Sequence, residues 1–323
     1  MPGVTMDPLR ALRAAARAVL HNEYGLENAR LTLLRNGRNI VFRVDSGGGE
    51  RFVLRVHNHD RLSDEAVRAQ MRWLQSIHRD TDVSVPVPVG VSQLRLEGVY
   101  FRAVLLRWVE GRALQKGSAF VRPQTLRDVG KATAKLHLHA AEGGPATLKG
   151  CPQLDEDSFF GQASCTGALG REMLKPREFD TVRRAAQKIR RAMRDVCRRD
   201  GEIGLIHGDL EPSNWVFHAG DARPIDFDEF GVGHFLFDLM QVVWTHAMWP
   251  DYPKYRAALL EGYESLRPIP DDVRPHLDLF QAVAFVQWLN KGLPCDQAEH
   301  ADFQRWLQPT VRRIGELCGV GKA

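Results

Sequence analysis

A run of short β-prone segments between residues 31 and 56 constrains the fold of this chain most strongly. Residues 31–35, 40–44 and 51–56 are rich in Val, Leu, Ile and Phe, and turn residues at 36–39 and 45–50 separate them. Connections this short join neighbouring antiparallel strands, whereas parallel strands need a crossover of roughly a dozen residues. The sequence therefore predicts an antiparallel meander here and excludes a βαβ array.

Helical periodicity flanks the meander. Apolar residues recur at helical spacing over residues 6–21 and 63–78, and Ser63 is a suitable N-cap for the second helix. Two prolines make residues 81–89 a loop or an edge segment, and residues 99–109 hold two further strand-like stretches. The pattern breaks at Glu110-Gly111, so we predict a first lobe over residues 1–110.

Residues 111–323 are predicted to be mostly helical. Helical patterns cover residues 123–139, 181–199, 235–248, 253–265, 271–289 and 301–317, while residues 205–228 contain short strands and turns. An antiparallel sheet with a helix, followed by a helical second lobe, gives a bilobal α+β fold.

Composition excludes several classes of protein. Hydrophobic residues make up 44% and charged residues 26% of the 323 residues, which is typical of a globular chain and not of a disordered one. No apolar stretch is long enough to cross a membrane, arginines interrupt the first 20 residues as no secretory signal would allow, and a net charge of +4 does not require nucleic acid. Five cysteines without a C-x-x-C pair favour reduced thiols, so we expect a cytoplasmic protein without membrane or nucleic-acid partners.

The segments 205–217 and 224–231 contain the strongest chemical signal. His207, Asp209 and Asn214 follow the pattern H-x-D-x-x-x-x-N, and Asp226 comes twelve residues after Asn214 in the run Asp-Phe-Asp. Phosphoryl transfer to a hydroxyl needs a carboxylate to accept the proton, and it needs oxygen ligands to hold Mg²⁺ against the nucleotide phosphates. The joint pattern therefore favours a phosphotransferase that uses ATP and Mg²⁺.

These motifs resemble the aminoglycoside phosphotransferase / choline kinase family, nearest the branch of type II homoserine kinases and bacterial stress-response kinases. The resemblance covers about residues 24–290 and implies a protein-kinase-like fold. It implies that Asp209 is the catalytic base, that Asn214 and Asp226 bind Mg²⁺, and that His207 supports the loop. Asp228 is a further candidate beside the metal or the substrate, and Glu211 stands where many relatives carry a second His.

Two more segments resemble the family. The run 231–239 ends in Asp238-Leu239, where we interpret Asp238 as a helix N-cap and an anchor for a loop. The segment Ala134-Lys-Leu-His137 matches a family helix that packs beneath the catalytic loop, so we expect a structural role for His137.

In the first lobe, Arg55 occupies the third-strand position where such kinases usually have a Lys that holds the nucleotide phosphates. A solvated strand arginine is the alternative. Gln70 stands where a carboxylate usually orients that cation, and it can accept a hydrogen bond from Arg55 without the ionic component. Asp64 and Glu65 are acidic alternatives one turn earlier. This departure leaves open a different mode of nucleotide binding or weak catalysis.

Two loops of the first lobe are further candidates for nucleotide contacts. The turn between the first two strands either reaches the phosphates or is an ordinary hairpin, and its members are Asn36, Gly37, Arg38 and Asn39. The inter-lobe stretch that we expect to bind adenine through its backbone contains Arg107, Trp108 and Val109, although Trp108 can equally be a packing residue.

The phosphate acceptor is the least defined part of the prediction. Candidates for its pocket are Trp244, His246, Trp249, Tyr252, Tyr255, Trp288 and Asn290, although aromatic residues at this density are more often core. The last third of the chain mixes acidic and basic residues, which argues against an acidic pocket for aminoglycoside antibiotics. We therefore predict ATP- and Mg²⁺-dependent phosphorylation of a small-molecule hydroxyl, on an amino alcohol, a sugar or an aminoglycoside-like compound. The alternatives are a Ser/Thr protein kinase of the stress-response type and a non-catalytic ATP-binding module.

Overall fold

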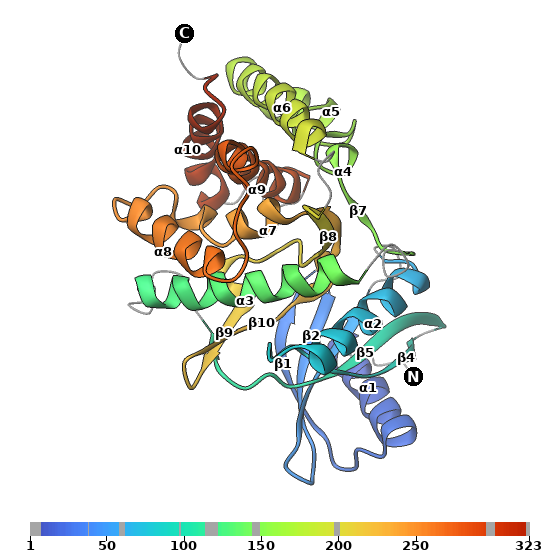
Figure 1. Ribbon diagram of the computed structural model, residues 1–323. Coiled ribbons are helices and arrows are strands. Elements are labelled where there is room, and N and C mark those ends of the chain that lie inside the picture. The colour runs from blue at the N-terminus through green and yellow to red at the C-terminus, as the bar shows by residue number, and fades with distance from the viewer. Residues whose placement is uncertain are drawn as a thin grey trace. The chain divides into compact units, whose positions relative to one another are not determined.

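The computed structural model describes residues 8–37, 39–57, 62–96, 98–113, 122–143, 149–196, 201–294 and 301–320 (Figure 1). The chain divides into two compact units, Met1–Glu110 and Gly111–Ala323. Each unit has its own sheets and helices. The mixed α+β class and the antiparallel sheet predicted from the sequence are confirmed.

The first unit is built around a five-stranded sheet of order β1-β2-β3-β5-β4 in which every neighbouring pair is antiparallel. The elements are α1 (Pro8–Tyr24), β1 (Arg30–Asn36), β2 (Asn39–Asp45), β3 (Arg51–His57), α2 (Asp64–Asp80), β4 (Pro88–Leu96) and β5 (Val99–Arg107). The predicted meander is thus β1 to β3, and Ser63 caps α2 by accepting a hydrogen bond from the N–H of Ala66.

The sheet gains an edge strand where the sequence predicts a loop or an edge segment. β4 begins at Pro88 and pairs with β5, which is one continuous strand rather than two stretches. A proline lacks the backbone N–H that a ladder needs, so it is tolerated at the first residue of an edge strand.

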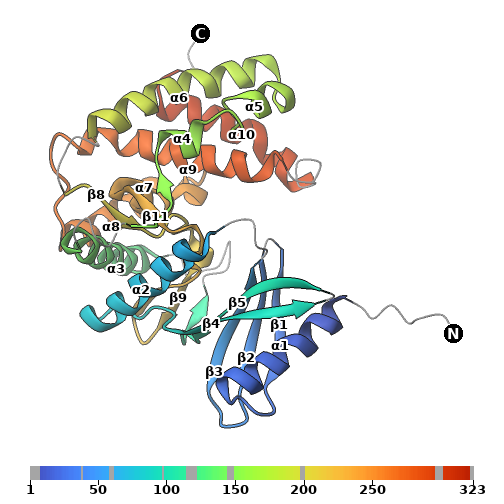
Figure 2. The same cartoon turned by 90° about the vertical axis from the view of Figure 1, so that its right-hand side faces the viewer.

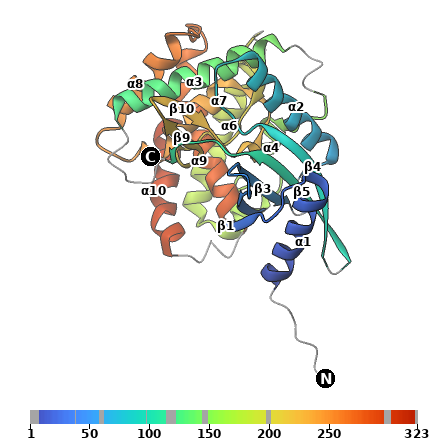
Figure 3. The ribbon, with the colours of Figure 1, turned by 90° about the horizontal axis from the view of Figure 1, so that it is seen from below.

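Helix α1 covers one face of this sheet and runs beside β4 (Figures 2 and 3). Its buried residues pack on alternate side chains of β2 and β3, and this core contains Leu12, Ala16, Leu20, Phe42, Val44, Phe52, Leu54 and Val56. Because side chains alternate across a strand, Arg55 lies on the opposite face of β3 from this core.

The second unit is mostly helical, as predicted. Its helices are α3 (Pro123–Glu142), α4 (Glu156–Phe160), α5 (Ala168–Met173), α6 (Pro176–Val196), α7 (Phe235–Gln241), α8 (Tyr252–Glu264), α9 (Leu277–Gly292) and α10 (Ala301–Leu317). Its strands are β6 (Arg112–Ala113), β7 (Gln153–Leu154), β8 (Ile203–Ile206), β9 (Trp215–His218), β10 (Asp221–Pro224) and β11 (Gly231–His234). They form two small sheets, β10-β9-β6 and β7-β11-β8.

Several helix boundaries differ from the prediction for identifiable reasons. α9 begins at Leu277 rather than 271 because Pro275 lies in the preceding 3-10 turn and cannot continue an α-helix. α6 begins earlier, at Pro176, since proline suits the first turn of a helix. α7 ends at Gln241, and a separate 3-10 turn covers Trp244–His246.

Two other expectations concern partners and thiols. Among the described helices, none combines the length and apolar content that a membrane crossing requires. Cys151, Cys165 and Cys318 are buried thiols, while Cys197 and Cys295 lie outside the described residues. The cytoplasmic location stays a prediction.

Candidate active site

The β9–β10 hairpin brings Asn214 and Asp226 to one end of the β10-β9-β6 sheet in the second unit. Trp215 pairs with Pro224, and the N–H of Ile225 donates to the carbonyl of Asn214 at 2.8 Å. Asn214 ends the 3-10 turn Pro212–Asn214, and Asp226 follows Ile225 directly in a left-handed conformation at φ 67°. The eleven residues between them in sequence therefore fold back as a hairpin.

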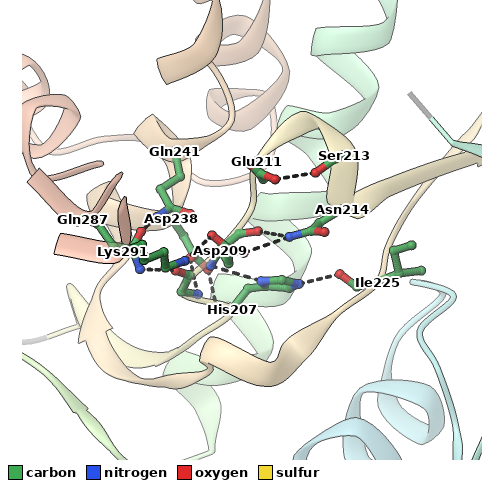
Figure 4. A network of polar contacts seen from close by, with 11 residues as sticks. His207, Asp209, Glu211, Ser213, Asn214, Ile225, Asp238, Gln241, Gln287 and Lys291 are labelled. Atoms are coloured by element: carbon green, nitrogen blue, oxygen red, sulfur yellow. Dashed lines mark hydrogen bonds and ion pairs between the residues drawn. The ribbon is translucent and has the colours of Figure 1, made fainter. Parts of the chain in front are cut away.

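Asp209 is held by contacts to both carboxylate oxygens (Figure 4). Its Oδ2 accepts a hydrogen bond from Nδ2 of Asn214 at 3.1 Å, and that nitrogen also donates to the Asp209 carbonyl at 2.7 Å. Its Oδ1 accepts from Nζ of Lys291 at 3.0 Å. The carboxylate thus joins its own loop to the end of α9.

The backbone that carries Asp209 is fixed by Asp238. The two oxygens of this fully buried carboxylate accept hydrogen bonds from the backbone N–H groups of His207 and Gly208, at 2.6 and 2.7 Å. The anchor role is therefore observed, but the N-cap interpretation is wrong. His234 is the N-cap of α7, where its Nδ1 accepts from the N–H of Leu236, and Asp238 lies within the first turn.

His207 links the loop to the strand that leads to Asp226. Its Nε2 contacts the carbonyl of Ile225 at 3.0 Å, and its Nδ1 accepts from the N–H of Asp209 at 3.3 Å. The ring also lies 4.3 Å from that of Phe227, measured between centroids. These contacts are those of a supporting residue, because the imidazole is completely buried and both ring nitrogens face backbone groups.

Gly208 has a conformation and a position that other residues cannot share. Its φ is +77°, and a Cβ built there would lie 2.1 Å from the carbonyl oxygen of Glu229. Only glycine avoids both the strain of a positive φ and this collision. The loop therefore packs directly against the backbone of the 3-10 turn Phe227–Glu229.

The charges around Asp209 act on it in opposite directions. Burial raises the pKa of Asp209, the nearby ammonium of Lys291 lowers it, and the carboxylates of Glu211 and Glu229 raise it. Behind the loop, burial lowers the pKa of His137, whose Nδ1 contacts the Tyr263 hydroxyl at 2.8 Å. His137 also lies 3.5 Å from the carboxylate of Asp238 through Nε2, so it packs behind the loop that Asp238 anchors, and its structural role stays a prediction.

The oxygen donors at the hairpin end fit a small hard cation. Nδ2 of Asn214 is engaged by Asp209, which leaves the amide oxygen on the other side of the group (Figure 4). In the part of the chain that the structure describes, no group of three His, Cys, Asp or Glu residues is arranged to hold a metal. One amide oxygen and one carboxylate are a suitable set for a cation that keeps its remaining ligands as water and phosphate.

Comparison with known proteins assigns this arrangement to a family. The model of the phosphotransferase enzyme family matches residues 30–280. The chain belongs to that family. It is therefore an enzyme, a phosphotransferase with a kinase-like fold.

Three relatives illustrate the similarity of this phosphotransferase to other members. A homoserine kinase of Gluconobacter oxydans is 31% identical over 168 residues, which is about half of each chain, 50% of this one and 51% of the relative. A microcompartment-associated aminopropanol kinase has a TM-score of 0.77 at 22% identity, with 96% of each chain covered. The amicoumacin kinase hAmiN, solved with AMP-PNP, Ca²⁺ and Ami, has a TM-score of 0.75 at 17% identity, covering 95% of this chain and 96% of that one.

In the first unit, the structure buries both Arg55, which is expected to hold the nucleotide phosphates, and Gln70, which is expected to orient Arg55. Arg55 is only 7% exposed on β3, where it pairs in register with Val41 and Val104, and Gln70 is buried on α2. Asp64, considered as an acidic partner for Arg55, instead forms an ion pair with Arg102 on β5. A buried arginine in the middle of the sheet does not match the alternative of a solvated one.

Backbone hydrogen bonds are present in both candidate nucleotide loops of the first unit, the turn 36–39 and the stretch 107–109. Asn36 ends β1 and Asn39 begins β2, with the N–H of Gly37 donating to the Asn39 carbonyl at 3.3 Å, while Arg38 lies outside the described residues. The N–H groups of Arg107 and Trp108 donate to the carbonyls of Val87 and Arg51. These two N–H groups are therefore already paired within the first unit, and the nucleotide contact of this stretch stays a prediction.

Most candidates for the acceptor pocket serve packing. His246 packs edge-on against the rings of Trp249 and Tyr255, and Trp288 lies between Trp244 and Phe303. Asn290 bonds backbone groups, with Oδ1 accepting from the N–H of Cys165 and Nδ2 donating to the carbonyl of Phe159. Tyr252 is buried and donates to Gln281.

Sequence reasoning missed Lys291 as a site residue. Lys291 lies 82 positions after Asp209 in the sequence and belongs to no recognisable motif. A usable signal was present, because it is the one cation of α9, whose sequence LDLFQAVAFVQWLNKG is otherwise almost wholly apolar or amide-bearing. A lone lysine at the end of a buried helix often has a specific carboxylate partner.

Proposed function

We propose that this phosphotransferase transfers the γ-phosphoryl group of ATP to the hydroxyl of a small amino alcohol. The observation that carries the proposal is Asp209, whose carboxylate is held on both oxygens in a loop anchored by Asp238, next to Asn214. A fixed carboxylate beside an amide oxygen and a second carboxylate is the set of groups that phosphoryl transfer to a hydroxyl requires.

Asp209 would act as the base. The acceptor hydroxyl gives its proton to the Asp209 carboxylate as the hydroxyl oxygen forms a bond to the γ-phosphorus. The bond between that phosphorus and the oxygen bridging to the β-phosphate breaks, and ADP leaves with the bonding electrons. The products are a phosphate monoester, ADP and one proton, which Asp209 later releases to water.

Asn214 and Asp226 would hold Mg²⁺, and Asp228, two residues further on in the 3-10 turn, would add a contact to the metal or the substrate. When bound, the ion neutralises charge on the nucleotide phosphates. The two protein ligands come from adjacent ends of one hairpin, so their separation is set by the Trp215–Pro224 pairing and not by flexible loops.

Arg55 is our candidate for the cation of the first unit that binds the α- and β-phosphates. A guanidinium keeps the positive charge of the usual Lys and can bind a phosphate with two parallel N–H bonds. Gln70 would support it as a neutral partner. The turn that includes Asn36, Gly37 and Asn39 and the stretch 107–109 are the remaining proposed nucleotide contacts.

The charge balance around Asp209 favours an acceptor that carries an ammonium group. The carboxylates of Glu211 and Glu229 lie close enough to Asp209 for their charges to raise its pKa, while the ammonium of Lys291 lowers it. Carboxylates grouped near the base attract a cationic acceptor. The homoserine kinase and the aminopropanol kinase are named for amino alcohols, which is consistent with this choice.

A product-monitored assay tests the proposal. The protein is incubated with ATP and Mg²⁺ and a panel of amino alcohols, neutral alcohols, aminoglycosides and a generic protein substrate, and phosphorylated products are detected by mass spectrometry. We expect phosphate monoesters of amino alcohols, and we expect EDTA to abolish them.

Asp209→Asn is the matched control, because it keeps the shape of the side chain and removes the base. Nucleotide binding should persist while turnover falls by about 10²–10⁴-fold. Equal turnover in Asp209→Asn would remove Asp209 from the mechanism. Phosphorylation of the protein substrate alone would replace the small-molecule acceptor with a protein, and ATP binding without any turnover would contradict the assignment of ATP as phosphoryl donor.

A further inference from the structure

We infer that Lys291 is a positioning residue for the catalytic carboxylate, and that the last two turns of α9 are part of the active site. The inference rests on the function proposed above, in which Asp209 is the base. It starts from the 3.0 Å contact between Nζ of Lys291 and Oδ1 of Asp209.

Helix α9 contacts two successive residues of the loop, Gly208 and Asp209. Gln287 and Lys291 are four residues apart and therefore lie on the same face of the helix. Nε2 of Gln287 donates to the carbonyl of Gly208 at 3.1 Å, while Lys291 contacts the side chain of the next residue, Asp209. Figure 4 shows both side chains directed at the loop from the same side. The two contacts, which we call the α9 clamp, together hold the loop against the end of α9.

The end of α9 is itself fixed, so the α9 clamp has a rigid base. Nε2 of Gln241, the last residue of α7, donates to Oε1 of Gln287. Asn290 ties the same turn to backbone groups of Phe159 and Cys165. Side chains that hold a reacting group are effective when neighbouring contacts lock them in place.

Lys291 completes the restraint of Asp209. Asn214 bonds one carboxylate oxygen and Lys291 bonds the other, so rotation of the carboxylate would break a contact on either side. The loop itself supplies no cation at position 211, where a carboxylate stands and bonds the Ser213 hydroxyl. The ammonium therefore comes from a helix distant in sequence.

A lysine in the last turn of a helix is also expected for a simpler reason, its attraction to the helix carboxyl end. That explanation alone would allow the long side chain to extend into water. Instead the Lys291 side chain is 29% exposed, and its head group lies on a carboxylate that is itself 24% exposed. The Lys291 side chain is thus directed at Asp209 and not into water.

Three variants test the inference with kcat and KM measured separately for nucleotide and acceptor. Lys291→Met removes the ammonium and keeps the aliphatic stem, and we expect kcat to fall by about 10–100-fold, since a small misplacement of a catalytic group costs this much. The KM for nucleotide should be unchanged. Lys291→Arg should retain most of the activity, because it keeps the charge. Lys254→Met, on the exposed part of α8, is the matched control for loss of one lysine and should behave like wild type.

Two further measurements separate positioning from a general structural role. In the Asp209→Asn background, Lys291→Met should lower kcat no further, because a residue that acts through Asp209 has nothing left to position. In Lys291→Ala, added ethylammonium should restore part of kcat. Additive losses in the double variant, or a conservative Lys291→Arg variant as poor as Lys291→Met, would overturn the inference.

The outcomes also distinguish this inference from the proposed function. If the wild-type protein phosphorylates an acceptor and Lys291→Met does so at the same rate or faster, the inference is wrong and the function stands. If the wild-type protein phosphorylates nothing in the panel, the proposed function is wrong and the inference falls with it.

Discussion

The buried carboxylate of Asp238 accepts a 2.6 Å hydrogen bond from the backbone N–H of His207, a residue 31 positions earlier in the chain. The same carboxylate accepts from the N–H of Gly208. The loop that carries Asp209 is therefore held through its backbone by α7, while its side chains stay available for chemistry. The position of the candidate base depends on this anchor as much as on the motif around it.

Asp238→Ala should both destabilise the protein and disable the loop. The substitution leaves two buried N–H groups without an acceptor, and each costs about 1–3 kcal/mol. We expect a lower midpoint in urea unfolding and loss of phosphotransfer. Asp238→Asn keeps one acceptor oxygen and should lose less of both. An alanine variant as stable and as active as the wild type would show that the anchor is dispensable.

Gly208→Ala should be far more damaging than the same change at Gly220. Both glycines have a positive φ, +77° and +92°, so both substitutions incur the backbone cost of about 1–2 kcal/mol. A Cβ at Gly220 meets nothing within 4 Å, whereas at Gly208 it meets the carbonyl of Glu229 at 2.1 Å. Thermal unfolding and turnover of the two variants, measured together, separate the collision from the φ effect. Equal losses at both positions would contradict the close packing of the loop.

Arg55→Ala should weaken nucleotide binding, because it removes the proposed phosphate contact on β3. The expected loss is about 10–100-fold in Kd, since hydrogen bonds to charged groups contribute about 1.5–3 kcal/mol. Arg55→Lys should restore part of the affinity. Arg30→Ala, at an exposed position on β1, serves as the control for loss of an arginine from the same sheet. Calorimetric titration with ATP and Mg²⁺ measures the effect, and unchanged affinity in Arg55→Ala would assign Arg55 to the fold alone.

His246 should make the protein less stable as the pH falls below neutrality. Burial lowers the pKa of His246 to about 4 from its ordinary value of 6.5. Above pH 6.5 the residue is neutral in both states. Between pH 6.5 and 4 the unfolded chain binds a proton that the folded protein does not, so the free energy of unfolding falls by about 1.4 kcal/mol per pH unit from this residue.

His246→Phe tests this pH dependence while keeping an aromatic ring against Trp249 and Tyr255. Urea unfolding of the variant at several pH values between 7 and 4 should show a shallower decline than the wild type, by about the slope of one proton. Parallel declines in the two proteins would mean that His246 is protonated in the folded state.

Much of the fold followed from local patterns. Turn residues at 36–39 and 45–50 predicted the β1–β3 meander, and helical spacing predicted most helices of the second unit. The differences lie where local propensity is weak, as in β4, whose Leu94 is buried in the core that α1 covers while Gln93 and Arg95 beside it are exposed. The predicted start of α9 at residue 271 is too early because helical spacing of apolar residues continues across Pro275, which lies in a 3-10 turn.

The residues of the candidate site also fall into those that local sequence predicts and those that depend on tertiary packing. Asp209, Asn214 and Asp226 are near one another in sequence, so their types and spacing were enough to select them. The motif selects Asp238 as an anchor but predicts the wrong cap role for it, since N-cap geometry depends on backbone angles that a motif does not contain. The contacts of the aromatic candidates and of Asn290 depend on packing among distant helices, so the sequence could not separate core from pocket.

The sequence by itself determined the order of the strands in the meander, the helical character of the second unit and the motif of a phosphotransferase, because each depends on residues within a few turns or one hairpin. Only the tertiary structure decided what holds that motif in place. Lys291 reaches Asp209 across 82 positions and Asp238 reaches His207 across 31, and such contacts exist only after α7 and α9 have packed around the loop. That packing is stabilised by the burial of many apolar side chains from distant parts of the chain, so no local sequence pattern can predict it.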